Sequence, residues 1–191
     1  KLHLMGNLSR TYFSKERSFT KKLNLLNLSF KGSLEHKFNE EYFISSVPLI
    51  RLSFLGGFIY YGAFAILDVF NLPEFLPQLL VIRFAIVGPA ILAIVLLSYT
   101  KGFKKWWQPG IALVTIISGG AIAIMTLIPD EIARENYYAG MILVLIYCYM
   151  LIRLRFIWAS MAGFIIVAIY LITLHLSTDI PKEIKLTNMF F

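Results

Sequence analysis

Two charged residues, Asp68 and Arg83, are the strongest candidates for chemistry in this sequence, because each adjoins or interrupts a long apolar stretch. A charge at the centre of a bilayer costs on the order of 2.5–3.5 kcal/mol on insertion scales. An ion pair between them, across the hairpin that joins the two stretches, would satisfy both. Tyr137 and Tyr138 begin a later apolar stretch on the same side. We therefore expect an extracytoplasmic polar cluster of Asp68, Arg83, Tyr137 and Tyr138, which either binds a ligand or only locks the hairpin.

Other kinds of chemistry have no signature here. The sequence contains no HExxH, CxxC, P-loop or GxSxG motif. His3, His36 and His175 are scattered and lack the spacing of metal ligands. Cys148 is the single cysteine, so neither an intramolecular disulfide nor a cysteine zinc site can form. We expect no catalytic residue, metal site or cofactor in this chain.

The composition indicates a membrane protein. Hydrophobic residues make up 58% of the 191 residues and charged residues 15%, whereas soluble domains carry about 25% charged residues. The mean hydropathy is +0.72. The net charge of +7 is typical of loops that face the cytoplasm. It does not indicate nucleic-acid binding, since no basic patch is interleaved with a soluble fold.

Apolar stretches predict an all-α bundle of transmembrane helices. Residues 1–47 form a basic cytoplasmic lead segment, and residues 48–191 form the bundle. A helix of about 17–25 apolar residues crosses about 30 Å of hydrocarbon at about 1.5 Å per residue. The predicted full spans cover residues 49–67, 76–98, 106–128, 137–152 and 156–176, and a sixth begins at residues 188–191.

Packing features inside the spans are of ordinary kinds. Pro89 should bend the second span, because proline removes a backbone donor from a helix. Gly119, Gly120 and Gly140 allow helices to approach closely.

Charges in the loops predict the orientation. Acidic residues dominate the first and third loops, whereas the second and fourth carry only basic residues. This alternation places the N-terminus in the cytoplasm by the positive-inside rule. The expected cytoplasmic anchors are Arg51, Lys101, Lys104, Lys105, Trp106, Trp107, Arg153 and Arg155.

Several short pieces of residues 45–191 resemble a known family of membrane regions. They include Tyr61–Phe64 with Leu67 and Asp68, Ile82–Val87 with Pro89, Tyr137–Leu143, Arg153–Phe156 and Asn188–Phe191. Together they are similar to the six-helix membrane region before the catalytic domain of certain bacterial adenylate/guanylate cyclases, prominent in cyanobacteria. Related membrane regions precede diguanylate cyclase domains.

The resemblance implies a dimeric membrane anchor and sensor module in the bacterial cytoplasmic (inner) membrane. In that family a sixth helix leads into a class III cyclase, but no position here matches the catalytic residues, so enzymatic activity stays open. The expected partners are membrane lipids, a second copy of the chain and an unidentified small-molecule or lipid ligand. The alternatives are a small transporter or channel subunit, which the few polar residues in the spans disfavour, and a structural subunit of a membrane complex.

Overall fold

The computed structural model describes residues 23–24, 29–30, 33–128 and 131–176 of the chain. Most of the expected lead segment and the whole expected start of a sixth span therefore lie outside the described residues. The chain divides into two compact units, residues 1–45 and 46–191, close to the predicted boundary after residue 47. Each unit is described by itself.

The first unit contains a short antiparallel pair, β1 (Leu23–Asn24) and β2 (Ser29–Phe30). It also contains the beginning of α2 (Ser33–Asn71), a helix that starts well before residue 49, where the first span was predicted. Local side-chain pairs explain the extension. The Asn39 amide donates to Glu35 Oε1 at 3.1 Å, four residues earlier, and the rings of Phe38 and Tyr42 stack with centroids 5.5 Å apart. Pairs at this spacing stabilise a helix.

In the second unit, the predicted second span is a continuous helical segment made of four parts. These are η1 (Pro73–Phe75), α3 (Leu76–Leu80), the π-helical stretch η2 (Val81–Val87) and α4 (Gly88–Leu97). Pro89 stands in the first turn of α4. Because proline has no amide hydrogen, the regular bonding of the preceding turn is interrupted there. The Gly88 amide donates instead to the Arg83 carbonyl, five residues back.

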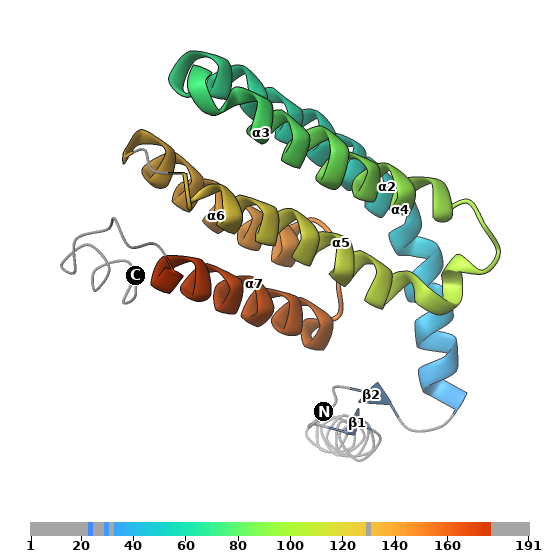
Figure 1. Cartoon of the computed structure of the whole chain (residues 1–191). Helices are drawn as coiled ribbons and strands as arrows, with labels where there is room; N and C mark the ends of the chain where they lie inside the picture. Colours follow the sequence, from blue (N-terminus) through green and yellow to red (C-terminus); the bar gives the residue numbers. More distant parts are fainter. Residues whose placement is uncertain (1–22, 25–28, 31–32, 129–130, 177–191) are drawn as a thin grey trace, which may run out of the picture. The chain divides into compact units, whose positions relative to one another are not determined.

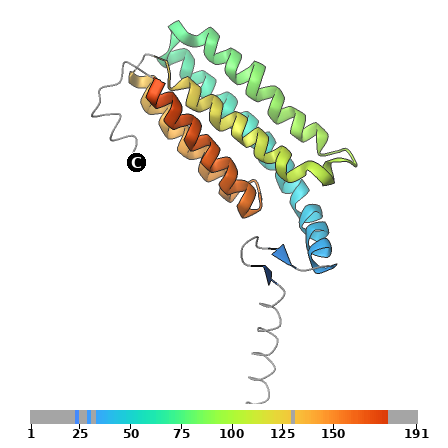
Figure 2. The ribbon, with the colours of Figure 1, turned by 60° about the horizontal axis from the view of Figure 1, so that its bottom comes forward.

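Three further helices complete the second unit: α5 (Phe103–Met125), α6 (Glu131–Met150) and α7 (Phe156–Leu176). Figures 1 and 2 show α4, α5, α6 and α7 running alongside one another, with α5 in contact with the other three. α5 and α7 approach closely at two glycines. A Cβ on Gly119 would lie 2.6 Å from Ile166 Cδ1, and one on Gly120 would lie 3.2 Å from Ile169 Cδ1.

One hydrophobic core joins the ends of several helices near the predicted cluster. Its buried residues come from the segment after α2, and from α3, α5, α6 and α7. They are Leu72, Leu79, Ile122, Ala123, Met125, Tyr137, Met141, Ile166 and Tyr170.

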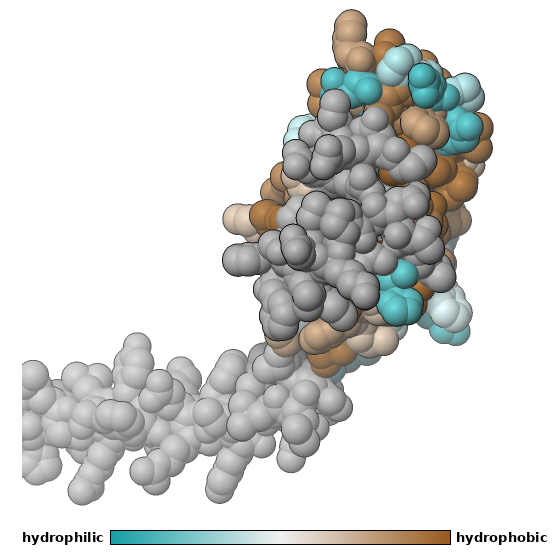
Figure 3. All heavy atoms as spheres, turned by 60° about the vertical axis from the view of Figure 1, so that its left-hand side comes forward, coloured by the Kyte–Doolittle hydropathy of each residue, from teal (hydrophilic) through white to brown (hydrophobic). Residues whose placement is uncertain are grey.

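The described part of the chain contains four helical segments that are long and apolar enough to cross a membrane, namely Glu35–Asn71, Pro73–Leu97, Phe103–Met125 and Phe156–His175. Many large apolar side chains on them are exposed, and hydrophobic residues cover much of the described surface in Figure 3. The described part of the chain is therefore all-helical apart from β1 and β2, and its long apolar helices indicate a membrane protein. The described apolar part of α6 is Ala139–Met150, about 18 Å long and short of a full crossing. The prediction of five full spans thus goes beyond the four found here.

Candidate functional site

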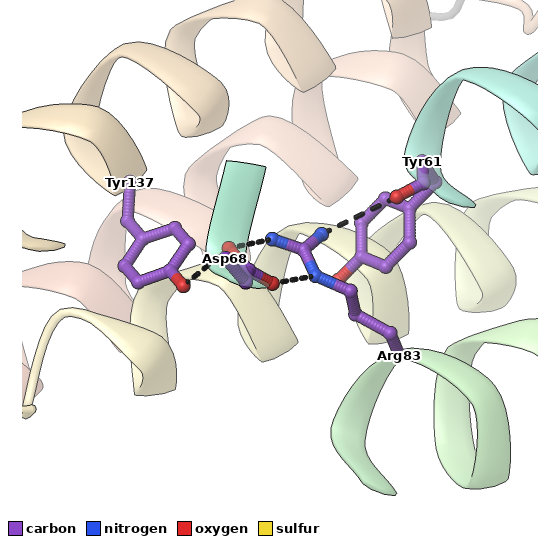
Figure 4. A network of polar contacts seen from close by, with 4 residues as sticks. All are labelled: Tyr61, Asp68, Arg83 and Tyr137. Atoms are coloured by element: carbon purple, nitrogen blue, oxygen red, sulfur yellow. Dashed lines mark hydrogen bonds and ion pairs between the residues drawn. The ribbon is translucent and has the colours of Figure 1, made fainter. Parts of the chain in front are cut away.

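Asp68 and Arg83 form a buried, two-pronged ion pair. The Arg83 Nε donates to Asp68 Oδ2 at 2.6 Å, and its Nη2 donates to Asp68 Oδ1 at 3.2 Å. The Asp68 side chain is only 5% exposed, and the Arg83 side chain only 3%. Figure 4 shows the guanidinium facing the carboxylate, with Asp68 at the end of α2 and Arg83 on η2. Charge-assisted bonds of this fork-like kind are the stronger ones in proteins.

Two tyrosines complete the network. The Tyr137 hydroxyl, from α6, donates to Asp68 Oδ1 at 2.9 Å. The Arg83 Nη1 donates to the Tyr61 carbonyl at 3.4 Å, and the guanidinium carbon lies 5.0 Å from the centroid of the Tyr61 ring. These four residues, Tyr61, Asp68, Arg83 and Tyr137, are called the polar cluster below (Figure 4).

Tyr61 was not among the predicted site residues. It precedes Asp68 by seven residues, which places both on one face of a helix after about two turns. That spacing was the available signal in the sequence, where Tyr60 stands directly before Tyr61. Tyr138, which was predicted for the site, lies in α6, and its side chain falls outside the part that the structure describes.

Local backbone structure positions Arg83. The π-helical stretch η2 is wider than an α-helix, and the carbonyl of Arg83 accepts the amide of Gly88 at its end. Such stretches occur frequently at functional sites and shift the facing of side chains relative to a regular helix. Pro89, which was expected only to bend the span, therefore lies in the turn that follows η2, the stretch that carries Arg83.

The polar cluster is electrically neutral, and its two charged groups are well bonded. Desolvation of two charges is costly, and in many proteins apolar replacement of a buried pair is neutral or stabilising. Here the carboxylate accepts bonds from both Arg83 and Tyr137, so three helical elements meet at one group. The Asp68 carboxylate therefore links α2, η2 and α6.

A cavity of about 640 Å³ lies beside the polar cluster and between α2 and α6. This volume falls in the range of small-molecule sites, roughly 300–1,000 Å³. All four cluster residues line one part of it. The rest of the lining is largely apolar and includes Phe54, Phe64, Ile91, Ile122, Leu143 and Val144.

Further polar contacts join α2 to the chain at and after the other end of α6. The Tyr147 hydroxyl donates to the Ser53 carbonyl, and the Ser53 hydroxyl donates to the Leu151 carbonyl at 3.1 Å. Both Tyr147 and the neighbouring Phe54 line the cavity. The cavity is therefore bordered by α2–α6 hydrogen bonds at both of its ends.

The predicted anchors occupy varied places. Arg51, one of the expected anchors, donates to Ser98 Oγ at 2.8 Å and to the Ser98 carbonyl at 2.7 Å, over the ring of Tyr99. It therefore binds the carboxyl end of α4, where cations are favoured. Trp106 is 65% exposed, but Trp107, expected beside it in an interfacial belt, is only 7% exposed and packs inside the bundle.

The basic anchors lie in connecting segments and at a helix start. Lys101 precedes α5, whereas Lys104 and Lys105 belong to its first turn, and all three are exposed. Arg153 has a positive φ of 52° in the turn after α6, and the Arg155 amide donates to Gln108 Oε1 at 2.9 Å.

The remaining predicted residues are packing positions. Gly119 and Gly120 lie at the close approach described above. Gly140 differs, because a Cβ there would lie 3.7 Å from Ile122 Cγ2, an ordinary contact. Among the described residues no group of three or more His, Cys, Asp or Glu side chains could hold a metal ion.

Comparison with known proteins gives no assignment: no protein-family model, no curated protein and no solved structure matches the chain. The class that the fold defines is a helical membrane protein with a buried ion pair beside a cavity. Any more specific function rests on the site itself.

Proposed function

We propose that this chain is a membrane-embedded sensor and anchor module that regulates a cytoplasmic effector encoded outside these residues. The observation that supports it most is the buried Asp68–Arg83 pair, held by Tyr137 and placed beside a cavity. Anchoring alone requires only apolar helices. A costly charged cluster that joins three helical elements instead suits a device with two packing arrangements, between which a ligand shifts the balance.

The proposed topology follows from the loop charges. The N-terminus faces the cytoplasm of a bacterial cell, five spans cross the inner membrane, and a sixth begins near residue 188. In this arrangement the polar cluster lies toward the extracytoplasmic side. A stimulus there would alter helix packing, and the last helix would carry the change to the effector.

The proposed effector is a class III adenylate/guanylate cyclase, and the working form is a homodimer. The support is the resemblance of residues 45–191 to the membrane regions of such enzymes. A transporter is less well supported, since the charged groups of the polar cluster neutralise one another instead of lining a continuous polar path.

The proposal is tested on the complete product of the gene. Its coding sequence beyond Phe191 should contain a sixth apolar span and a cyclase domain. Expressed in a bacterium without its own adenylate cyclase, the protein should make a cyclic nucleotide, and Tyr137→Phe should change the rate by severalfold at equal membrane abundance. A matched Tyr149→Phe variant should leave the rate unchanged, since Tyr149 is half exposed on α6 and lies outside the cavity lining. A coding sequence that ends at Phe191, or an effector insensitive to Tyr137→Phe, would refute it.

A further inference from the structure

We infer that the cavity between α2 and α6 binds an uncharged, single-chain amphiphile, with its apolar chain along the aromatic and aliphatic lining and its head-group oxygen at Tyr61. The purpose of such binding rests on the proposed sensor function. The binding itself is argued from the cavity and can be measured without any effector.

The lining selects an apolar chain. Most of the residues around the cavity are hydrophobic, and they come from α2, α4, α5 and α6. The hydroxyls of Thr115 and Ser118, which also line it, donate their hydrogens to carbonyls of their own helix at 2.9 Å, so neither offers a free donor to a ligand. A chain that leaves water for this space gains the free energy of apolar burial.

The route of entry is lateral. Tyr60, Leu67 and Leu143 line the cavity and are 51%, 51% and 37% exposed. The cavity thus reaches the apolar surface of the bundle, which faces lipid. A ligand that partitions into the membrane can enter between these two helices.

Charge balance excludes a charged head group. The guanidinium of Arg83 and the carboxylate of Asp68 neutralise each other at 2.6 Å, so neither an anion nor a cation would meet an unpaired opposite charge. In a low-dielectric site, an ion without a counter-ion is strongly disfavoured. The head group should therefore be neutral.

One lining residue has an unsatisfied polar atom. The Tyr61 hydroxyl is buried and has no hydrogen-bond partner in the part of the chain that the structure describes. Buried hydroxyls are normally bonded, and an exception calls for a missing partner. An alcohol or carbonyl oxygen at the polar end of the cavity would be that partner, since a hydroxyl both donates and accepts.

The inference is tested by photolabelling of the full chain in lipid nanodiscs with a diazirine derivative of dodecanol. Labelling should saturate and map to the cavity-lining parts of α2 and α6. Dodecanol should compete, whereas dodecanoate of equal chain length and dodecane should compete much less. Labelling that does not saturate, or equal competition by dodecanoate, would overturn the inference.

Two variants separate binding from folding. Tyr61→Phe removes an atom without a partner, so the variant should fold as well as the wild type while its affinity for dodecanol falls roughly three- to tenfold, the equivalent of one hydrogen bond. Leu143→Trp should block the mouth of the cavity and abolish saturable labelling. Tyr149→Phe, outside the lining, should change nothing. Unchanged affinity in Tyr61→Phe would contradict the assignment of the head group.

One further measurement identifies the source of the amphiphile, and a second separates a failure of the binding inference from a failure of the proposed sensor function. Mass spectrometry of the extracted protein identifies a neutral single-chain lipid if the membrane supplies it, whereas a ligand-free protein that binds added dodecanol indicates an external source. Saturable binding with an insensitive effector would count against the sensor function alone.

Discussion

Replacing Arg83 by leucine should lower the free energy of unfolding by about 3–5 kcal/mol, the usual cost of removing one partner of a buried pair. The structure explains the size of the effect. Two of the three hydrogen bonds to the Asp68 carboxylate come from Arg83, and Asp68 is almost fully buried, so water cannot take their place. Only the Tyr137 hydroxyl would remain to stabilise the negative charge.

The matched control removes the whole network. A triple variant, Asp68→Leu with Arg83→Leu and Tyr137→Phe, leaves no buried charge and no newly unpaired hydroxyl. Apolar replacement of a complete buried pair is often neutral or stabilising by about 1–4 kcal/mol. The triple variant should therefore be more stable than Arg83→Leu, although it carries two more substitutions.

The measurement is unfolding of the purified protein in mixed micelles, titrated with sodium dodecyl sulfate and followed by far-ultraviolet circular dichroism. A triple variant that is as unstable as Arg83→Leu, or less stable, would refute the reasoning. The loss of stability in Arg83→Leu would then come mainly from the lost attraction between Asp68 and Arg83, and not from leaving the Asp68 charge buried without a partner. The same preparations, assayed for effector output, distinguish a hairpin lock from a ligand-dependent site: lost stability with a normal response excludes the ligand role.

Three other substitutions test separate contacts by the same unfolding measurement. Tyr137→Phe removes one bond to a charged acceptor, Asp68, and should cost about 1.5–3 kcal/mol. Gly119→Ala should cost about 1–3 kcal/mol, because its Cβ would lie 2.6 Å from Ile166 Cδ1. Arg51→Lys should cost about 1 kcal/mol, since a lysine cannot reproduce both hydrogen bonds to the end of α4 and the stacking on an aromatic ring.

Two of these predictions, for Gly119→Ala and Arg51→Lys, have further checks. Gly140→Ala, where the new Cβ would be 3.7 Å from its neighbour, should be close to neutral, and a cost equal to that of Gly119→Ala would contradict the packing argument. Ile166→Ala should make Gly119→Ala cheaper than in the wild-type background; strict additivity would show that the two residues do not clash. Full stability of Arg51→Lys would show that its charge alone matters.

The apolar helices were the most predictable part of the fold. α7 covers Phe156–Leu176, the residues predicted for the fifth span, and α5 is shifted by three residues from its predicted bounds. Hydrophobicity over a long stretch is a strong signal, and it determines these helices. The start of α2 at Ser33 was not predicted, because residues 33–41 are polar and their helix depends on local pairs such as Asn39 with Glu35.

The polar cluster was only partly predictable. Asp68 and Arg83 stood out because charges are rare in apolar stretches, and the structure brings them together with Tyr137. Tyr61 did not stand out, since its part comes from a backbone carbonyl and a ring face, which any residue or any aromatic could supply. The contacts of Arg51 could not be predicted, because nothing local to it indicates that Ser98, far along the chain, presents a helix end.

The cavity could not have been predicted at all, because it depends on the distance between two helices and not on any motif. Its borders nevertheless suggest how the two proposals connect. α2 and α6 are joined by Tyr137 and Asp68 at one end, while Tyr147 and Ser53 join them at the other, and the space between them holds no such bond among the described residues. An amphiphile that fills this space would add apolar contacts between α2 and α6 in the middle of the cavity, and so would alter their balance with the α2–α6 hydrogen bonds at its two ends. Because a ligand shifts an equilibrium only by its differential affinity for the two states, we expect its effect on output to disappear when Tyr137→Phe removes one of the end contacts.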